Sequence, residues 1–165
     1  MNKELLNGLD PLQVFPIGYV RRQPGNMVIE VLPRFRPALL NLEHFSHLLV
    51  IFWADQHGQI GFRNEIDLQV DPPYAPGKIT GIFATRSEVR PNPILLTPCK
   101  IEQVDMDKGV VRLQMIDALD GSPVLDMKGY FPIMDRVNGA AIPEWLDWGL
   151  DHVPDEGLGL YEEME

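Results

Sequence analysis

The chain contains a single cysteine, Cys99, among its 165 residues. One thiol excludes an intrachain disulfide and is consistent with a reducing compartment. Long hydrophobic runs are also missing, since the longest, residues 48–54, is far too short to span a bilayer. The first ten residues lack the basic start and apolar run of a signal peptide. We therefore expect a soluble, cytoplasmic protein with no membrane partner, in which residues 1–13 form an N-terminal leader.

Basic residues are in the minority, with 14 Lys and Arg against 24 Asp and Glu and a net charge of −10. This balance is the opposite of the usual nucleic-acid-binding composition, so it disfavours tRNA as a partner without excluding it. Seven of the arginines lie in the first ninety residues, whereas residues 147–165 contain no Lys or Arg. A basic face around a site and a set of scattered, solvated arginines both remain open.

Helical periodicity is scarce, and no G-x-G-x-x-G motif for a dinucleotide cofactor is present. Short β-branched runs bounded by Gly, Pro, Asn and Asp recur instead. They predict a mainly β fold, with residues 14–140 forming a single antiparallel β-barrel-like domain that has short helical additions. The predicted strands are residues 14–21, 27–32, 47–53, 65–70, 78–84, 94–104, 110–116 and 124–130.

Turn residues predict the connections between these strands. Residues 105–109 are expected to form a hairpin loop, because Gly109 can accept a positive φ. Residues 71–77 are rich in proline and must form a loop, and residues 33–43 are either extended or a short helical turn. Residues 141–165 are expected to hold a short helix, over 142–150, and an acidic C-terminal tail.

The segment with the most chemistry is residues 81–94, which read GIFATRSEVRPNPI. Its prolines fix φ and keep the residues before them out of the helical region. Arg86 and Arg90 carry planar donor groups suited to carboxylates or phosphates, and Asn92 adds an amide. On its own, this pattern is more typical of a proline-rich surface turn with solvated arginines.

Three blocks in this chain, in the same order, resemble the TrmO-like (TsaA/YaeB) family of S-adenosylmethionine-dependent tRNA methyltransferases. The ATRSxxRPNPI run is similar to the family signature, residues 42–48 (LEHFSHL) to its L-E-x-F-S-H-L, and residues 120–130 (DGSPVLDMKGY) to its D-G-T-P-V-L-D-I-K-P-Y. The resemblance implies a β-barrel unrelated to the Rossmann form. It also implies S-adenosyl-L-methionine as cofactor and assembly as a homodimer.

The resemblance also implies roles for matched residues. The cofactor-binding positions would be Gln56, Arg86, Leu119, Asp120, Gly121 and Ser122. The substrate or pocket positions would be Asp55, Arg90, Asn92, Pro93, Asp126, Lys128 and Tyr130. Arg86 would bind the methionyl carboxylate or hold its loop. Because Asp126, Lys128 and Tyr130 alternate along a predicted strand, they share one face, which lines a pocket or is solvated.

The catalytic residue stays unassigned. His47 is a second-tier candidate base, although a histidine on an apolar strand is more often a hydrogen-bonded core residue. No metal is expected, because a strand would place His44 and His47 on opposite faces and no cysteine pair assists. Cys99 follows Pro98 in an apolar strand, where burial would raise its pKa and keep it inert.

The chain departs from the family pattern at three positions. Asp55 replaces a histidine, Leu95 replaces a glycine and adds bulk beside the expected site, and Gly129 replaces a proline. The fold is therefore more secure than the substrate. The first functional hypothesis is N6-methylation of the threonylcarbamoylated adenosine next to the tRNA anticodon. The alternatives are a methyltransferase acting on a small molecule and a non-catalytic barrel that binds an adenosine-containing ligand.

Overall fold

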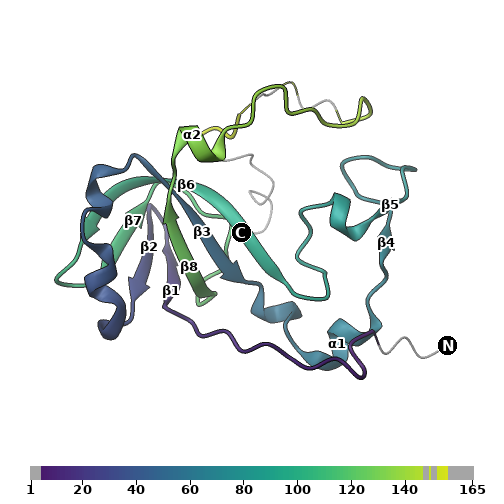
Figure 1. Ribbon diagram of the computed structural model, residues 1–165, viewed down its shortest axis with the longest axis horizontal. Helices are drawn as coiled ribbons and strands as arrows, with labels where there is room; N and C mark the ends of the chain where they lie inside the picture. Colours follow the sequence, from purple (N-terminus) through teal and green to yellow (C-terminus); the bar gives the residue numbers. More distant parts are fainter. Residues whose placement is uncertain (1–4, 147–148, 150–151, 156–165) are drawn as a thin grey trace.

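Six strands of the computed structural model form a closed antiparallel barrel in the order β1-β2-β7-β6-β3-β8 (Figure 1). The structure describes residues 5–146, 149 and 152–155. The barrel strands are β1 (Gly18–Gln23), β2 (Asn26–Val31), β3 (His47–Trp53), β6 (Ile94–Asp105), β7 (Val110–Leu113) and β8 (Pro123–Gly129). The predicted fold class, a mainly β chain with one antiparallel barrel, is confirmed.

Alternation of side chains along the strands builds the core. In β3, Leu48, Val50 and Phe52 are buried, whereas the residues between them face outward and are half-buried. The same period of two holds in β7, where Val111 and Leu113 are buried. Each barrel strand has a paired neighbour on both sides along at least part of its length, and this pairing fixes which of its residues face the core.

Two predicted strands outside the barrel are mostly wrong. Within the predicted ranges 65–70 and 78–84, only β4 (Gln69–Val70) and β5 (Thr80–Gly81) pair with each other. The helix α1 (Ile60–Glu65) precedes them, and a 3-10 helix, Ile82–Ala84, follows. The apolar residues there resemble a strand locally, but no neighbouring strand is present to extend the pairing.

The structure agrees with the predicted connections between strands. Gly109 has a φ of 72° and its N–H donates to Asp105 O at 2.8 Å, so the hairpin loop is confirmed. Residues 71–77 are a loop closed by Gly77 N, which donates to Asp71 Oδ1 at 2.7 Å. Between β2 and β3 the chain forms two 3-10 helices, Pro33–Leu39 and Leu42–His44. Of the two alternatives predicted for residues 33–43, the helical one is therefore correct.

The predicted helix over 142–150 is not found in its described part. Residues 143–146 form a turn in which Leu146 N donates to Pro143 O at 2.8 Å. Residues 147–148 and 150, and most of the predicted acidic tail, lie outside the described residues. The short helix after β8 is α2 (Pro132–Asp135). Among the described residues, no helix has the length and apolar character needed to cross a bilayer.

Residues 54–93, called the insert below, connect β3 to β6 and lie beside the barrel (Figure 1). The insert contains α1, β4 and β5 and carries the arginine-rich loop. Both ends of the insert join neighbouring strands, since Trp53 pairs with Ile94. The insert therefore starts and finishes at one end of the barrel.

Candidate functional site at the edge of strand β6

The first half of β6 has one edge that β7 does not cover. β3 pairs with residues 94–100 on one side, whereas β7 pairs only with residues 101–105 on the other. On the uncovered edge, Lys100 O accepts a bond from Gln114 N at 3.1 Å. Because carbonyls an even number of residues apart point to the same edge, Leu96 O faces this edge too. Arg86 Nη2 donates to Leu96 O at 2.5 Å, so the insert places an arginine there.

Residues 117–122 flank the same edge. Thr97 Oγ1 donates to Asp117 Oδ1, and Arg22 Nη1 donates to Ala118 O at 3.2 Å. The backbone N–H of Arg22 donates to Asp120 Oδ1 at 2.8 Å. This segment is therefore fastened to both β6 and β1. We call the group of Arg22, Arg86, Leu96, Thr97 and residues 117–122 the β6 edge site.

The glycine in this segment is required by the backbone. Gly121 has a φ of 82°, which a residue with a side chain rarely adopts, and its N–H donates to Val20 O at 2.9 Å. A Cβ built on Gly121 meets nothing within 4 Å, so the space beside it is open. A ligand can therefore approach the backbone closely at this point.

The structure brings together some of the sequence-predicted cofactor residues and separates others. Arg86, Leu119 and Asp120 are exposed at the β6 edge site. Ser122 is buried and its carbonyl accepts from Val20 N at 3.0 Å, which is a structural contact. Gln56 is exposed in a separate 3-10 helix, Asp55–His57, at the start of the insert.

The segment of residues 85–93 is called the Arg-Pro-Asn-Pro loop. Its polar residues mainly make contacts that stabilise the loop. Arg90 Nη1 donates to Thr85 O at 3.3 Å and to Ser87 O at 2.9 Å. Asn92 Oδ1 accepts from Arg63 Nη2 at 2.7 Å. Pro93 is fully buried, and its carbonyl accepts from Ala54 N at 2.9 Å. Of the two arginines that the sequence singled out, Arg86 reaches the barrel edge and Arg90 stabilises the turn.

Arg63 in α1 is a residue that the sequence analysis missed. Its Nε donates to Pro91 O at 2.5 Å, and its guanidinium lies 5.4 Å from the centre of the Trp53 ring. Burial lowers the pKa of Arg63 from its ordinary value. Arg63 thus joins the end of β3, the helix α1 and the Arg-Pro-Asn-Pro loop. Nothing in the sequence around Arg63 indicates these contacts, because each one is made across the fold.

The outward face of β8 carries the predicted polar row. Lys128 Nζ donates to Asp126 Oδ2 at 2.6 Å, so these two side chains share a face and pair along the strand. The Tyr130 ring lies 6.4 Å from the His47 ring in an edge-on arrangement. His47 is at the start of β3, the end opposite the insert, so it is not part of the β6 edge site. His47 therefore lies away from the arginine and carboxylate groups of that site.

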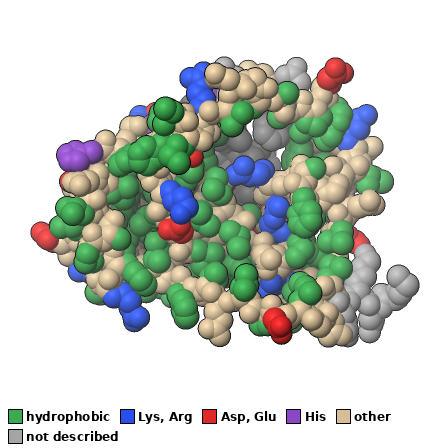
Figure 2. Space-filling model, viewed as in Figure 1, with side chains coloured by type: hydrophobic (Ala, Val, Ile, Leu, Met, Phe, Trp, Pro, Cys, Tyr) green, Lys and Arg blue, Asp and Glu red, His purple; other side chains and the backbone are tan. Residues whose placement is uncertain are grey.

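Four of the nine arginines lie at the β6 edge site or in the insert. Arg22, Arg63, Arg86 and Arg90 all contact residues of the β6 edge site or of the Arg-Pro-Asn-Pro loop. Figure 2 shows several basic side chains near the middle of this face, with most of the acidic ones nearer its rim. The β6 edge site itself combines Arg22 and Arg86 with Asp117 and Asp120, so basic and acidic groups lie side by side there.

Comparison with known proteins places these residues in a family. Residues 13–136 match the family described as the tRNA-methyltransferase O N-terminal domain. The chain belongs to this TrmO family. The resemblance stated from three sequence blocks is thereby confirmed.

Relatives of this TrmO-family chain include an S-adenosyl-L-methionine-binding protein of Archaeoglobus fulgidus, 36% identical over 110 residues, which are 67% of this chain and 73% of that protein. A tRNA (adenine(37)-N6)-methyltransferase of Mus musculus is 41% identical over 105 residues, which are 64% of this chain and 23% of the mouse protein. The crystal structure of TrmO from Pseudomonas aeruginosa matches with a TM-score of 0.62 and 33% identity, covering 84% of this chain and 63% of that one. The chain thus spans less than two thirds of the mouse and Pseudomonas proteins.

Two departures from the TrmO pattern have structural explanations. Leu95 packs against the barrel core, so its added bulk lies in the core and does not point towards the Arg86 contact. A Cβ at Gly129 would lie 2.7 Å from the Phe45 ring, so glycine makes room for this ring. Asp55 is exposed, and its carbonyl accepts from Gly58 N at 3.1 Å.

Cys99 is inert, as expected. Its side chain is 2% exposed inside the barrel. Burial, and secondarily the charge of Asp117, raise the pKa of the Cys99 thiol far above its usual range. A thiol that stays protonated is a poor nucleophile. Cys99 is therefore a poor candidate for a catalytic nucleophile.

Proposed function

We propose that this TrmO-family chain binds S-adenosyl-L-methionine at the β6 edge site and methylates N6 of the threonylcarbamoylated adenosine next to the tRNA anticodon. The observation that carries the proposal is the arrangement of Arg86 and residues 117–122 along one uncovered strand edge. The names of the Archaeoglobus and mouse relatives support the cofactor and the substrate class. A tRNA substrate also supports a cytoplasmic location.

The residues at the edge fit the chemistry of this cofactor. Arg86 is exposed and uses one donor on Leu96 O, so the other N–H groups of its fork can donate to a carboxylate. Asp120 is exposed and takes one backbone bond, which leaves it acceptor capacity for hydroxyl or amino groups. The open space beside Gly121 suits the close approach of a flat base to the backbone.

When bound, S-adenosyl-L-methionine supplies an activated methyl group on a positively charged sulfur. The work of the chain is then to align the acceptor nitrogen with that methyl group, because correct alignment removes much of the barrier. Arg86 would hold the carboxylate end of the cofactor, and the backbone of residues 119–121 would hold the base. The carboxylates of Asp117 and Asp120 are the acceptors that this edge offers for the proton released by N6.

Titration calorimetry on the full chain tests the cofactor. We expect binding heat with both S-adenosyl-L-methionine and S-adenosylhomocysteine. The absence of heat with either compound would refute the cofactor assignment. Incubation with tRNA that carries the threonylcarbamoyl group, followed by nucleoside digestion, then tests the acceptor through the appearance of the methylated nucleoside.

A second candidate keeps the cofactor and replaces tRNA by a small molecule. The net charge of −10 favours it, because a polyanionic substrate is repelled at long range. Nucleoside digests of tRNA from a deletion strain and its parent separate the candidates, since an unchanged methylated-nucleoside peak rules out tRNA. A non-catalytic adenosine-binding barrel predicts a third outcome: ligand binding persists with no methyl transfer to a broad substrate extract.

The proposal includes a homodimer. The segment after β8 exposes apolar side chains that a solvated monomer would leave in water. They are Phe131, Ile133, Met134, Val137, Ile142 and Trp145. Ile133 is 93% exposed, so Ile133→Asp should leave the barrel intact and dissociate the dimer in sedimentation velocity. A wild-type chain that sediments as a monomer at micromolar concentration contradicts this part of the proposal.

A further inference from the structure

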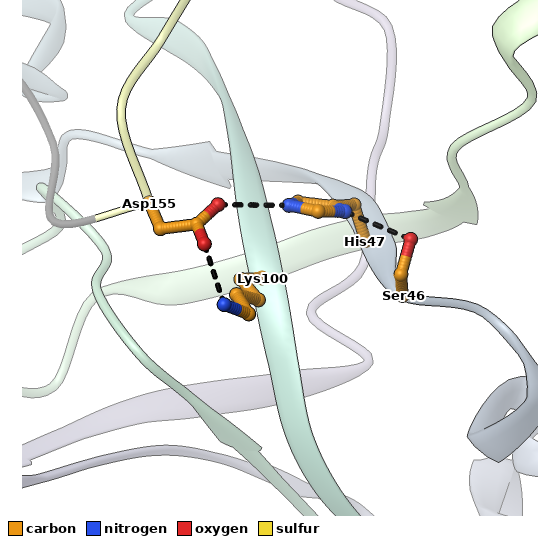
Figure 3. A network of polar contacts seen from close by, with 4 residues as sticks. All are labelled: Ser46, His47, Lys100 and Asp155. Atoms are coloured by element: carbon orange, nitrogen blue, oxygen red, sulfur yellow. Dashed lines mark hydrogen bonds and ion pairs between the residues drawn. The ribbon is translucent and has the colours of Figure 1, made fainter.

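A carboxylate from the C-terminal segment is bound on the outside of the barrel. Asp155 Oδ2 accepts from Lys100 Nζ at 2.5 Å, and Asp155 Oδ1 lies 3.2 Å from His47 Nε2 (Figure 3). The other ring nitrogen of His47 contacts Ser46 Oγ at 2.9 Å. One carboxylate therefore bridges two donors that come from different strands.

The two donors belong to the rigid part of the molecule. His47 and Lys100 are directly opposed partners in the β3–β6 pair, so the barrel fixes their spacing. Tyr130, which follows β8, packs edge-on against His47 and orients its ring. The site that holds Asp155 is thus built by the barrel and does not depend on the C-terminal segment for its shape. We call His47, Lys100 and Tyr130 the anion patch.

The anion patch is open to solvent and lies on the strand that also carries the cofactor site. The side chains of His47, Lys100 and Asp155 are 35%, 41% and 39% exposed. Lys100 is four residues from Leu96 along β6, which corresponds to about 13 Å in an extended strand. A polyanion bound beside the β6 edge site can therefore also reach Lys100. A nucleic acid backbone suits this arrangement, because it carries a phosphate at every nucleotide.

We propose that the anion patch is a subsite for a backbone phosphate of the RNA substrate, and that Asp155 occupies it in the free protein as an internal substitute. The proposal rests on the proposed tRNA methyltransferase function for the identity of the polyanion. Binding of RNA displaces the Asp155 carboxylate from Lys100 and His47. Residues 152–155 then leave the outer face of the barrel, so Asp155 competes with RNA for part of the substrate surface.

Replacing the Asp155 carboxylate by a phosphate should cost little free energy. Exposed ion pairs contribute little to stability, and salt screens them further. A phosphate offers the same kind of charged acceptor oxygen as the carboxylate, with additional oxygens for both donors. Because the two ligands compete for the same donors, removal of the carboxylate should strengthen RNA binding, and removal of Lys100 should cancel that gain.

The test measures fluorescence anisotropy of a fluorescein-labelled tRNA transcript with the full chain, from 50 to 200 mM NaCl. Three variants are compared with wild type: Asp155→Ala, Glu144→Ala, and the double variant Lys100→Ala with Asp155→Ala. Glu144 is exposed in the same C-terminal segment, so Glu144→Ala makes the same charge change without touching the patch. All substituted side chains are at the surface, and circular dichroism verifies that the barrel is folded.

We expect Asp155→Ala to bind the transcript at least about threefold more tightly than Glu144→Ala at 50 mM NaCl. The slope of log K against log salt should steepen by about 0.9, which is the value for one additional phosphate contact. In the double variant both gains should disappear. Equal affinities for Asp155→Ala and Glu144→Ala would overturn the proposal, and so would a gain that survives the loss of Lys100.

Two further readouts keep the outcomes distinct. If a polyglutamate peptide binds Asp155→Ala better than the transcript does, the patch recognises acidic protein and the RNA assignment is refuted. Calorimetry with S-adenosyl-L-methionine on the same samples reports the proposed function separately. If the wild type binds the cofactor and Asp155→Ala has unchanged RNA affinity, the phosphate subsite is refuted and the methyltransferase proposal is not. If the cofactor does not bind but Asp155→Ala gains RNA affinity in a way that depends on Lys100, the methyltransferase proposal is refuted and the phosphate subsite is not.

Discussion

The barrel and the insert are stabilised in different ways. In the barrel, each strand pairs with two neighbours and a continuous apolar core fills the interior. In the insert, the short strands β4 and β5 and the helix α1 are held by polar contacts from Arg63, Arg90 and Asp71 and by a few buried apolar residues, which are Ile66, Ala75 and Ile82. The insert nevertheless supplies Arg86. A rigid scaffold that positions a lightly packed loop is a common way to build a binding site, because the loop can adapt to the ligand.

The largest effect should come from the barrel core. Phe52 is 2% exposed in β3, and Phe52→Ala should lower the free energy of unfolding by about 3–5 kcal/mol through lost burial and a cavity. Urea denaturation followed by far-UV circular dichroism measures this loss. Ile82 in the insert is also buried, at 1% exposed. Ile82→Ala should cost less globally, because the insert can open while the barrel stays folded; equal losses would mean that the two regions unfold as one.

A pair of glycine substitutions sharpens the comparison. Gly129→Ala places a Cβ 2.7 Å from the Phe45 ring in the barrel, so overpacking should cost about 1–3 kcal/mol. Gly81→Ala in the insert meets nothing within 4 Å and should change stability by less than about 0.5 kcal/mol. Thermal unfolding of both variants provides the measurement. If Gly129→Ala proves neutral, Phe45 moves away from β8 easily and the barrel is less tightly packed than its geometry indicates.

The same contrast explains what the sequence could predict. The β3 segment is a short apolar run, and such runs bounded by turn residues are enough to predict the barrel strands. Residues 65–70 alternate polar and apolar residues as a strand does, but whether they pair depends on a partner that no local pattern reveals. Tertiary context decided against most of that strand.

The residues of the candidate site also differ in whether the sequence could predict them. Arg86 and Asp120 could be named in advance because their motifs resemble a family, and the structure places both at one strand edge. Arg63 could not be named, since its partners Pro91 and Asn92 are 28 and 29 residues away in sequence. Asp155 lies 55 residues from Lys100, and its contact with the barrel has no sequence pattern at all.

Arg86 tests whether the insert serves the site and not the fold. Arg86→Ala should weaken S-adenosyl-L-methionine binding by about 2 kcal/mol, the usual scale for a lost hydrogen bond to a charged group. Its effect on the unfolding free energy should be small, because the side chain is exposed. Calorimetry gives the first quantity and urea denaturation the second. Arg34→Ala, on the 3-10 helix between β2 and β3, is the matched control; unchanged affinity in Arg86→Ala would remove Arg86 from the site.

Arg63 tests how the insert is positioned. Arg63→Gln loses the stacking on Trp53 and weakens the contact with the Arg-Pro-Asn-Pro loop, at a cost of about 1 kcal/mol. We expect faster amide hydrogen exchange in residues 85–94 and unchanged exchange in β3. Cofactor affinity should fall by less than in Arg86→Ala, since Arg63 acts through the loop. Uniform acceleration across the barrel would show that Arg63 supports the whole fold.

The smallest expected effect concerns Asp155, whose side chain contacts the barrel. Residues 152–155 are thus a third region to compare with the barrel and the insert. The bond from Lys100, followed by the bond from His47, lowers the pKa of Asp155 from its ordinary value. A depressed folded-state pKa means that the contact contributes above the unfolded value, near 3.9, and is lost as pH falls through the lower folded value. The C-terminal segment should therefore stay attached at pH 5 and detach only in stronger acid.

Carboxyl ¹³C NMR of Asp155, assigned with Asp155→Asn, follows this titration. Lys100→Ala removes the largest cause of the shift, so the Asp155 pKa should rise towards that of an ordinary aspartate. Lys108→Ala, which removes a lysine paired with Asp105 in the β6–β7 loop, should leave the Asp155 titration unchanged. If Asp155 titrates like a free aspartate in wild type, the segment is detached in solution. The outer face of β3 and β6 would then be open to a polyanion from the start, and the affinity gain expected for Asp155→Ala should vanish with it.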